Sequence, residues 1–185
     1  MKADIEFALR REPIVDVLAG LHARGLLPER VTHNDCKLNN VLLDDATGEG
    51  VCVIDLDTVM PGLVLYDFGD MCRTATCPTA EDERDLARVE MRLDMFAALV
   101  NGYLDSAGGF LNPVEKDHLV FCARLITFEI GIRFLTDHLE GDRYFKVHRP
   151  GHSADRARVQ FKMVDSFERH EEAMRKVVEA ARRAG

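Results

Sequence analysis

The sequence predicts an α+β domain that is mostly helical and contains one small β-ribbon. Apolar residues recur at helical spacing over most of the chain from about residue 81 onward. In the N-terminal third, two short apolar runs, 40–43 and 51–56, flank a loop rich in turn-forming residues. The chain of 185 residues has no internal repeat and no low-complexity linker. We therefore expect one domain over residues 1–185.

The first elements follow from local signals. Residues 4–25 are expected to form a helix, in which Pro13 can open a turn and the apolar residues after it line one face. The runs 40–43 and 51–56 are apolar and contain β-branched residues, and they are expected to pair as a hairpin with a fairly long loop. This hairpin would form a ribbon over residues 41–57.

Helical signals dominate the rest of the chain, and residues 81–183 are expected to be its helical part. The first helix would begin with the acidic residues from Glu81 and end near the glycines at 108–109. The next opens with the capping pattern of Asn112 and Glu115 and is expected to close at Gly141. A last amphipathic helix is expected over residues 154–183.

Composition excludes several classes of function. The net charge of −8 argues against nucleic acid or an anionic membrane surface as a partner. No run approaches the ~20 apolar residues of a membrane span, and the first residues lack the apolar region of a signal peptide. The five cysteines include no C-x-x-C pair, so we expect reduced thiols in a cytoplasmic protein.

The stretch HNDCKLNN, residues 33–40, carries the chemistry. Phosphoryl transfer needs a carboxylate that accepts the proton of the attacking hydroxyl, and oxygen ligands that hold Mg²⁺ against the phosphates. In this catalytic loop, Asp35 would be the base and Asn40, five residues later, a metal ligand. Lys37 could place a positive charge near the transferred group. His33 is expected to brace the loop by hydrogen bonds.

Two further aspartates belong to this pattern. Asp55 follows the second strand of the expected ribbon, where a carboxylate is costly unless a cation pairs with it. We therefore expect Asp55 to be the metal aspartate. Asp67 lies in a literal D-F-G triplet, but too far along the chain for that role. It is expected to cap the segment after it or to hold the catalytic loop from behind. The alternative is that Asp35 and Asn40 cap turns, while Asp55 and Asp57 cap the next segment.

Three stretches resemble one family: HNDCKLNNVLL, VIDLDTVMPG and LYDFGDMCR look like the C-terminal lobe of the aminoglycoside phosphotransferase and choline kinase superfamily. The stretch TFEIGIRFLTDHLEGDRYFKV resembles its N-acetylhexosamine 1-kinase branch most closely. The resemblance covers nearly all of residues 28–170. It implies a protein-kinase-like fold, with ATP as co-substrate and Mg²⁺ as cofactor.

The resemblance also implies individual roles. Asp35 takes the family's base position, Asn40 and Asp55 its metal positions, and Asp67 the structural aspartate that follows. Lys37 stands where the family more often has a histidine.

The chain departs from the family pattern at its start. Such kinases carry a nucleotide-binding lobe, with a glycine-rich flap and a phosphate-binding lysine, before the catalytic loop. Only 32 residues precede His33 here, and they read as helix. We therefore expect an isolated C-terminal lobe, or a protein that has lost nucleotide clamping. Such a chain is expected to be inactive alone, and to bind its missing lobe or to associate with itself through the exposed seam.

The acceptor site is expected in the helical half. Glu129, Arg133 and Asp137 form one charged stripe at i, i+4 spacing. The stripe is either a salt-bridge ladder in solvent or, for Arg133, a group that reaches into the cleft to hold a sugar. Tyr144, just past Gly141, could contact the same ligand. The alignment with N-acetylhexosamine kinases favours Arg133 and Tyr144 as sugar-binding residues.

Three functions remain open at this point. The leading one is a kinase that phosphorylates a sugar hydroxyl, at the anomeric position of an N-acetylhexosamine. The second is an aminoglycoside or choline kinase, whose cationic substrates would suit the acidic chain but would call for carboxylates where Arg133 stands. The third is a non-catalytic binding module that kept the kinase scaffold.

Overall fold

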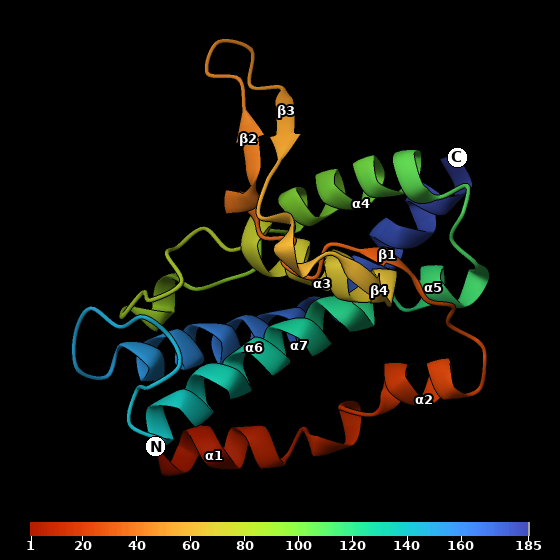
Figure 1. Ribbon diagram of the computed structural model, residues 1–185. Coiled ribbons are helices and arrows are strands. Elements are labelled where there is room, and N and C mark those ends of the chain that lie inside the picture. Colours follow the sequence, from red (N-terminus) through yellow and green to blue (C-terminus); the bar gives the residue numbers. More distant parts are fainter. Residues whose placement is uncertain (185) are drawn as a thin grey trace.

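Two long helices form the base of the fold. In the computed structural model, which describes residues 1–184, α6 (Leu119–Leu139) and α7 (His152–Ala184) pack along each other (Figure 1). Their contact is close at Gly131 of α6, where a Cβ atom would lie 2.7 Å from a ring carbon of Phe161 in α7. Only glycine allows this approach. The last helix is thus confirmed within two residues of its predicted start.

Two further helices cover this pair and enclose the main core. Helix α3 (Val64–Ala75) packs on α6, and α4 (Leu93–Ala107) packs on α7. Phe68 and Phe96, one from each covering helix, are fully buried and meet edge to face with ring centroids 6.4 Å apart. Burying such a side chain stabilises the fold by roughly 1.5–3 kcal/mol. The core therefore fixes α3, which carries the polar residues described below.

The N-terminal segment differs from the single helix expected over residues 4–25. It consists of α1 (Lys2–Leu9), a 3-10 turn η1 (Glu12–Ile14) and α2 (Val17–Ala23). Pro13 lies inside η1. Proline removes one hydrogen-bond donor and clashes with the preceding turn, so it ends a helix that reaches it from the N-terminal side. The prediction treated Pro13 as part of a continuous helix and was wrong for that reason.

The predicted ribbon is present, but its second strand ends at Val53, and the rest of the predicted range, up to residue 57, leaves the strand. Strands β2 (Val41–Leu43) and β3 (Gly50–Val53) pair antiparallel, and the ribbon projects from the body of the molecule (Figure 1). A second pair, β1 (Arg30–Thr32) with β4 (Met60–Gly62), was not predicted. This second pair closes the base of the whole segment between residues 33 and 59, including the short turns η2 (Leu38–Asn40) and η3 (Leu56–Thr58).

The remaining helical predictions were correct in part. Residues 81–92 contain only the turn η4 (Leu86–Arg88), so the helix expected from Glu81 begins at α4 instead. The capping box of Asn112 and Glu115 is confirmed, but it starts the short helix α5 (Pro113–Asp117). The chain then breaks at His118 before α6 begins. Among residues 1–184, no helix is both long and apolar enough to cross a membrane. The predicted class, a mostly helical α+β fold with a small ribbon, is confirmed.

Candidate active site

One side of helix α3 holds the start of the catalytic loop. The two carboxylate oxygens of Asp67 accept hydrogen bonds from the backbone N–H groups of His33 and Asn34, at 2.8 and 2.7 Å. About two turns further along the same helix, the hydroxyl of Thr74 accepts the N–H of Leu38 at 3.1 Å. Residues seven apart lie on the same face of a helix. A single helix therefore anchors both ends of the polar stretch.

His33 joins the loop to the end of the ribbon. Its Nδ1 accepts the N–H of Asp35 at 3.3 Å, so Nε2 carries the proton and donates to the carbonyl of Ile54 at 3.0 Å. The hydroxyl of Thr58 donates to the carbonyl of His33 at 2.6 Å. Both ring nitrogens of His33 are used in holding backbone, which is the bracing geometry expected for it.

Asp35 sits at the centre of a polar cluster. One of its carboxylate oxygens accepts from Lys37 Nζ at 2.6 Å and from Asn40 Nδ2 at 2.9 Å. Burial alone would raise the pKa of Asp35, but the hydrogen bonds from Lys37 and Asn40 outweigh it and hold the pKa below its ordinary value. Asp35 is therefore ionised at neutral pH and able to accept a proton.

Asp55 faces the same cluster from the end of the ribbon. Its backbone is left-handed, with φ 65°, a conformation that aspartate tolerates better than most residues. Its carboxylate lies 3.4 Å from Asn40 Nδ2 and 3.7 Å from Lys37 Nζ. The turn thus brings a half-exposed carboxylate next to the buried amide of Asn40.

This donor set fits Mg²⁺. The residues that the structure describes contain no group of three or more His, Cys, Asp or Glu side chains placed to hold a metal ion. Mg²⁺ does not need one, because it is usually held by one or two protein oxygens together with water and substrate phosphates. The Asp55 carboxylate can supply one such ligand. Asn40 turns its Nδ2 toward Asp35 and Asp55, so its amide oxygen would become a second ligand once the amide group rotates by half a turn. Lys37 Nζ lies 2.6 Å from the Asp35 carboxylate and 3.7 Å from that of Asp55.

Behind the cluster runs a chain of ion pairs that was not predicted; its members Asp70 and Arg73 are buried, whereas Glu81 and Arg156 are partly exposed. Arg73 pairs with Asp70, three residues earlier on α3, at 2.8 Å, and with Glu81 at 2.7 Å. The other oxygen of Glu81 accepts from Arg156 Nε of α7 at 2.9 Å. The spacing of Asp70 and Arg73 on one helix could have indicated the first pair. Nothing in the sequence indicates the link between Glu81 and Arg156, which are 75 residues apart.

The two residues expected to bind the acceptor substrate form a second group. Arg133 and Tyr144 are both exposed, and the guanidinium carbon lies 5.8 Å from the ring centroid of Tyr144. The salt-bridge ladder considered for the charged stripe is wrong: among residues 1–184, no ion pair joins Glu129, Arg133 and Asp137. Arg133 is left as a cation without an acidic partner in the part of the chain described.

Asp137 has a different part in this group. It is 3% exposed, and its oxygens accept the N–H groups of Tyr144 at 2.6 Å and Phe145 at 3.4 Å and the hydroxyl of Ser153 at 2.9 Å. Burial alone would raise its pKa, but these donors hold the pKa of Asp137 below its ordinary value. The carboxylate therefore fixes the loop that presents Tyr144.

The structure thus places the predicted residues in two groups. One network of hydrogen bonds joins the residues of the catalytic loop and its supports: His33, Asp35, Lys37, Asn40, Asp55 and Asp67. Arg133 and Tyr144 belong to the other. In a comparison with protein families, the model of the phosphotransferase enzyme family matches residues 2–100. The match covers the first group and stops before the second.

Proposed function

Because the chain belongs to the phosphotransferase enzyme family, we propose that it is the catalytic and acceptor-binding lobe of a kinase that uses ATP and Mg²⁺ to phosphorylate a sugar hydroxyl. Family membership indicates transfer of a phosphoryl group to a small molecule. The acceptor proposed is an N-acetylhexosamine, and the reacting group is its anomeric hydroxyl.

The observation that carries the proposal is the convergence at Asp35. The carboxylate of Asp35, whose pKa is lowered, accepts hydrogen bonds from Lys37 and Asn40 at 2.6 and 2.9 Å. A second carboxylate, that of Asp55, faces them from the end of the ribbon. Phosphoryl transfer depends on positioning and charge stabilisation, and asks little covalent chemistry of the protein. A rigid set of this kind is what the reaction requires.

Each residue has a distinct part in the proposed reaction. Asp35 orients the acceptor hydroxyl and accepts its proton as the oxygen bonds to phosphorus and the bond to ADP breaks. Lys37, now paired with Asp35, is placed to offset the negative charge of the transferred group. Asn40 and Asp55 would hold Mg²⁺, which neutralises charge on the phosphates when bound.

Arg133 supports a neutral acceptor over a cationic one. A binding site for choline or an aminoglycoside would be expected to offer unpaired carboxylates. Arg133 is instead an exposed arginine without an acidic partner among the described residues, next to an exposed tyrosine, although the exposed carboxylate of Glu129 lies one helical turn before it. Both can hydrogen-bond the hydroxyl or acetamido oxygens of a sugar.

The test uses a chimaera in which the nucleotide-binding lobe of a family member precedes this chain. We expect it to form N-acetylhexosamine 1-phosphate from ATP, detected by ³¹P NMR. Asp35→Asn should lower kcat by roughly 10²- to 10⁴-fold, as for loss of a general base. Arg133→Ala should raise KM for the sugar more than KM for ATP. Near-normal kcat in the Asp35 variant would remove the base assignment, and equal KM effects would remove Arg133 from the acceptor site.

A further inference from the structure

A cavity of about 490 Å³ opens between the segment that follows α3 and the loop that joins α6 to α7. Its lining includes Glu81 and Arg156 on one side and Phe145, Lys146 and His148 on the other. The volume lies in the range of small-molecule sites. None of the roles assigned so far uses this cavity.

Contacts tie the cavity to both groups of the candidate site. On one side, Glu81 links Arg156 to Arg73, whose helix anchors the catalytic loop. Phe145, which also lines the cavity, lies close to two arginines. The guanidinium carbons of Arg133 and Arg156 are 5.6 and 5.3 Å from its centroid. Phe145 therefore links the cavity to Arg133, and Glu81 links it to the helix behind Asp35.

The floor of the cavity is ordered before any ligand binds. His152 is 7% exposed, and its Nδ1 accepts the N–H of His148 at 3.2 Å. Its Nε2 must then carry the proton, which points at Asp82 Oδ2, 3.2 Å away. Asp82 is also 3.4 Å from Arg149. A polar floor held in this way loses little conformational entropy when a ligand binds.

The lining indicates the class of ligand. Its two carboxylates are already paired, Glu81 with two arginines and Asp82 with His152 and Arg149, so neither is free for a cation. Lys146 is exposed and, among residues 1–184, has no ion-pair partner. Phe145 offers an apolar ring face. Hydroxyl groups can donate to the paired carboxylates and accept from Lys146 and His148.

We propose that this cavity is a subsite for the acceptor, and that it binds the uncharged, polyhydroxylated part of the molecule remote from the reacting hydroxyl. The inference rests on the proposed function, since it extends the acceptor site from Arg133 and Tyr144 past Phe145. Lys146 and His148 then determine specificity by direct hydrogen bonds to the ligand.

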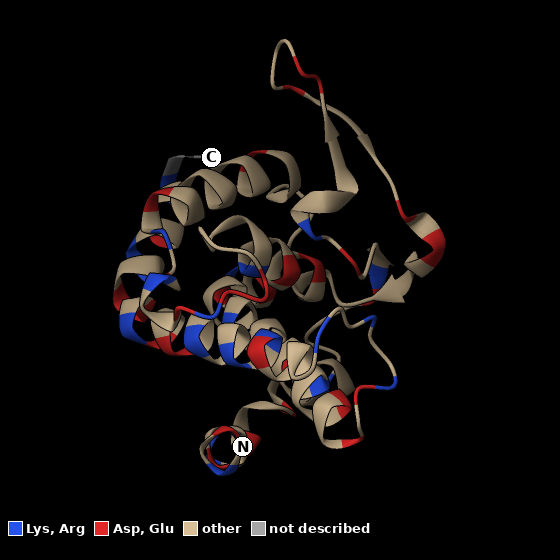
Figure 2. Ribbon diagram, turned by 90° about the vertical axis from the view of Figure 1, so that its left-hand side faces the viewer, with Lys and Arg blue, Asp and Glu red and all other residues tan. Residues whose placement is uncertain are grey.

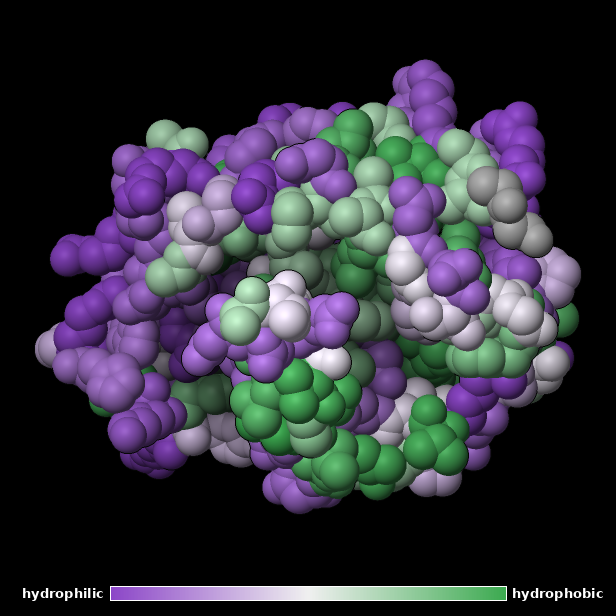
Figure 3. Space-filling model, turned by 90° about the horizontal axis from the view of Figure 1, so that it is seen from above, coloured by the Kyte–Doolittle hydropathy of each residue, from purple (hydrophilic) through white to green (hydrophobic). Residues whose placement is uncertain are grey.

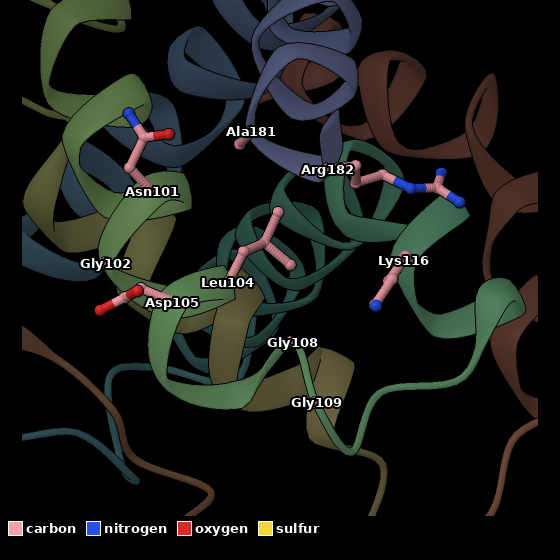
Figure 4. A pocket seen from close by; sticks show the side chains of 9 residues that line it. All are labelled: Asn101, Gly102, Leu104, Asp105, Gly108, Gly109, Lys116, Ala181 and Arg182. Carbon is pink, nitrogen blue, oxygen red and sulfur yellow. The ribbon is translucent and has the colours of Figure 1, made fainter. Parts of the chain in front are cut away.

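The experiment is an NMR titration of the ¹⁵N-labelled 185-residue chain with N-acetylglucosamine as the probe. We expect the amide signals of residues 81–82 and 145–148 to shift together with those near Arg133. Lys146→Ala and His148→Ala, both at exposed positions, should each weaken binding about 3- to 10-fold, the effect of one hydrogen bond. The matched control is Lys116→Ala, which removes a lysine from a separate cavity of about 650 Å³ between α4, α5 and the end of α7 (Figure 4).

The outcomes separate the subsite from the proposed function. If the probe shifts signals only near the catalytic loop, Arg133 and Tyr144, and both variants bind it normally, the subsite is wrong and the proposed acceptor stands. If Lys116→Ala weakens binding as much as the other variants, the ligand occupies the other cavity and the subsite is again wrong. If N-acetylglucosamine does not bind, or kanamycin binds more tightly, the proposed acceptor fails and the subsite with it.

Discussion

Asp67 fixes the catalytic loop with both of its carboxylate oxygens. They accept the N–H groups of two consecutive residues, His33 and Asn34, so neither peptide plane can rotate freely. Asn34 is held in a left-handed conformation with φ 63°, which costs on the order of 1 kcal/mol or more. The two hydrogen bonds offset that strain and set the direction in which Asp35 points.

Replacement of this carboxylate should lower stability. Asp67→Ala leaves one partly buried and one exposed N–H group without their acceptors. We expect a loss of about 1–3 kcal/mol in the free energy of unfolding, measured by urea denaturation. The matched control is Asp57→Ala, which removes an exposed carboxylate from the neighbouring turn η3 and should change stability by less than about 0.5 kcal/mol. Equal losses in both variants would show that Asp67 does not support the loop.

The spacing of residues in the sequence predicted the contacts within the catalytic loop, but not the ion pairs that lie behind the loop. The short offsets between Asp35, Lys37 and Asn40 predicted that they would lie together, because a tight turn leaves few other arrangements. Asp55 could be assigned to the same cluster, because a hairpin returns the chain to the point where its first strand began. The pairing of Glu81 with Arg73 and Arg156 depends on how α3 and α7 pack, and no local pattern records that packing.

The loop after α6 is a second element held by one carboxylate. Gly141 and Asp142 turn the chain in left-handed conformations, with φ 93° and 57°. The turn carries Tyr144 and Phe145 back over the helix end, where the buried Asp137 accepts their N–H groups. The position of the acceptor residues therefore depends on a carboxylate that does not itself face the ligand.

This contact should make the loop sensitive to acid. Because the folded-state pKa of Asp137 is lowered, its stabilising effect is complete above its unfolded pKa of about 3.9 and is lost as pH falls through the folded value. We expect Asp137→Asn to be less stable than the parent chain at pH 7, and the difference to shrink as pH falls below about 4. Thermal unfolding across this range measures it. A difference that does not change with pH would contradict the assigned role.

At the scale of elements, the sequence predicted α7 and the ribbon but not α3. Helix α3 starts at Val64, and its N-cap residue is Leu63, which offers no side-chain cap, so the usual start signal is missing. Residues 81–92 have the opposite problem: they read as helix but form a loop. Their polar groups are taken by distant partners, such as Ser166, which accepts the N–H of Met91 at 2.9 Å. Tertiary contacts override local propensity in both places.

The whole molecule exposes apolar residues where the ribbon meets its body. Figure 3, which looks down on the ribbon tip, shows hydrophobic side chains gathered beside it. Val31, Val51 and Leu56 are 82%, 67% and 60% exposed. The tip itself is acidic (Figure 2), with Asp44, Asp45 and Glu49. At ~25 cal/mol per Å², covering a few hundred Å² of such surface is worth several kcal/mol.

This face should drive association of the chain with itself when no nucleotide-binding lobe covers it. We expect concentration-dependent dimers or larger species in sedimentation velocity. Val51→Lys, on the ribbon, should shift the chain toward monomer. The matched control is Leu139→Lys, at the exposed end of α6 away from the ribbon, which should leave association unchanged. A monomer at high concentration would count against this expectation.

Asn40 and Asp55 are proposed to bind a metal ion beside Asp35. Line broadening in the ¹⁵N spectrum of the chain tests this with substoichiometric Mn²⁺, which accepts the same oxygen ligands as Mg²⁺, in the presence of ATP. We expect the signals of residues 35–40 and 54–56 to broaden first, and Asp55→Asn to abolish this effect. Broadening centred on the acidic ribbon tip at residues 44–49, and unchanged in the Asp55 variant, would contradict the claim.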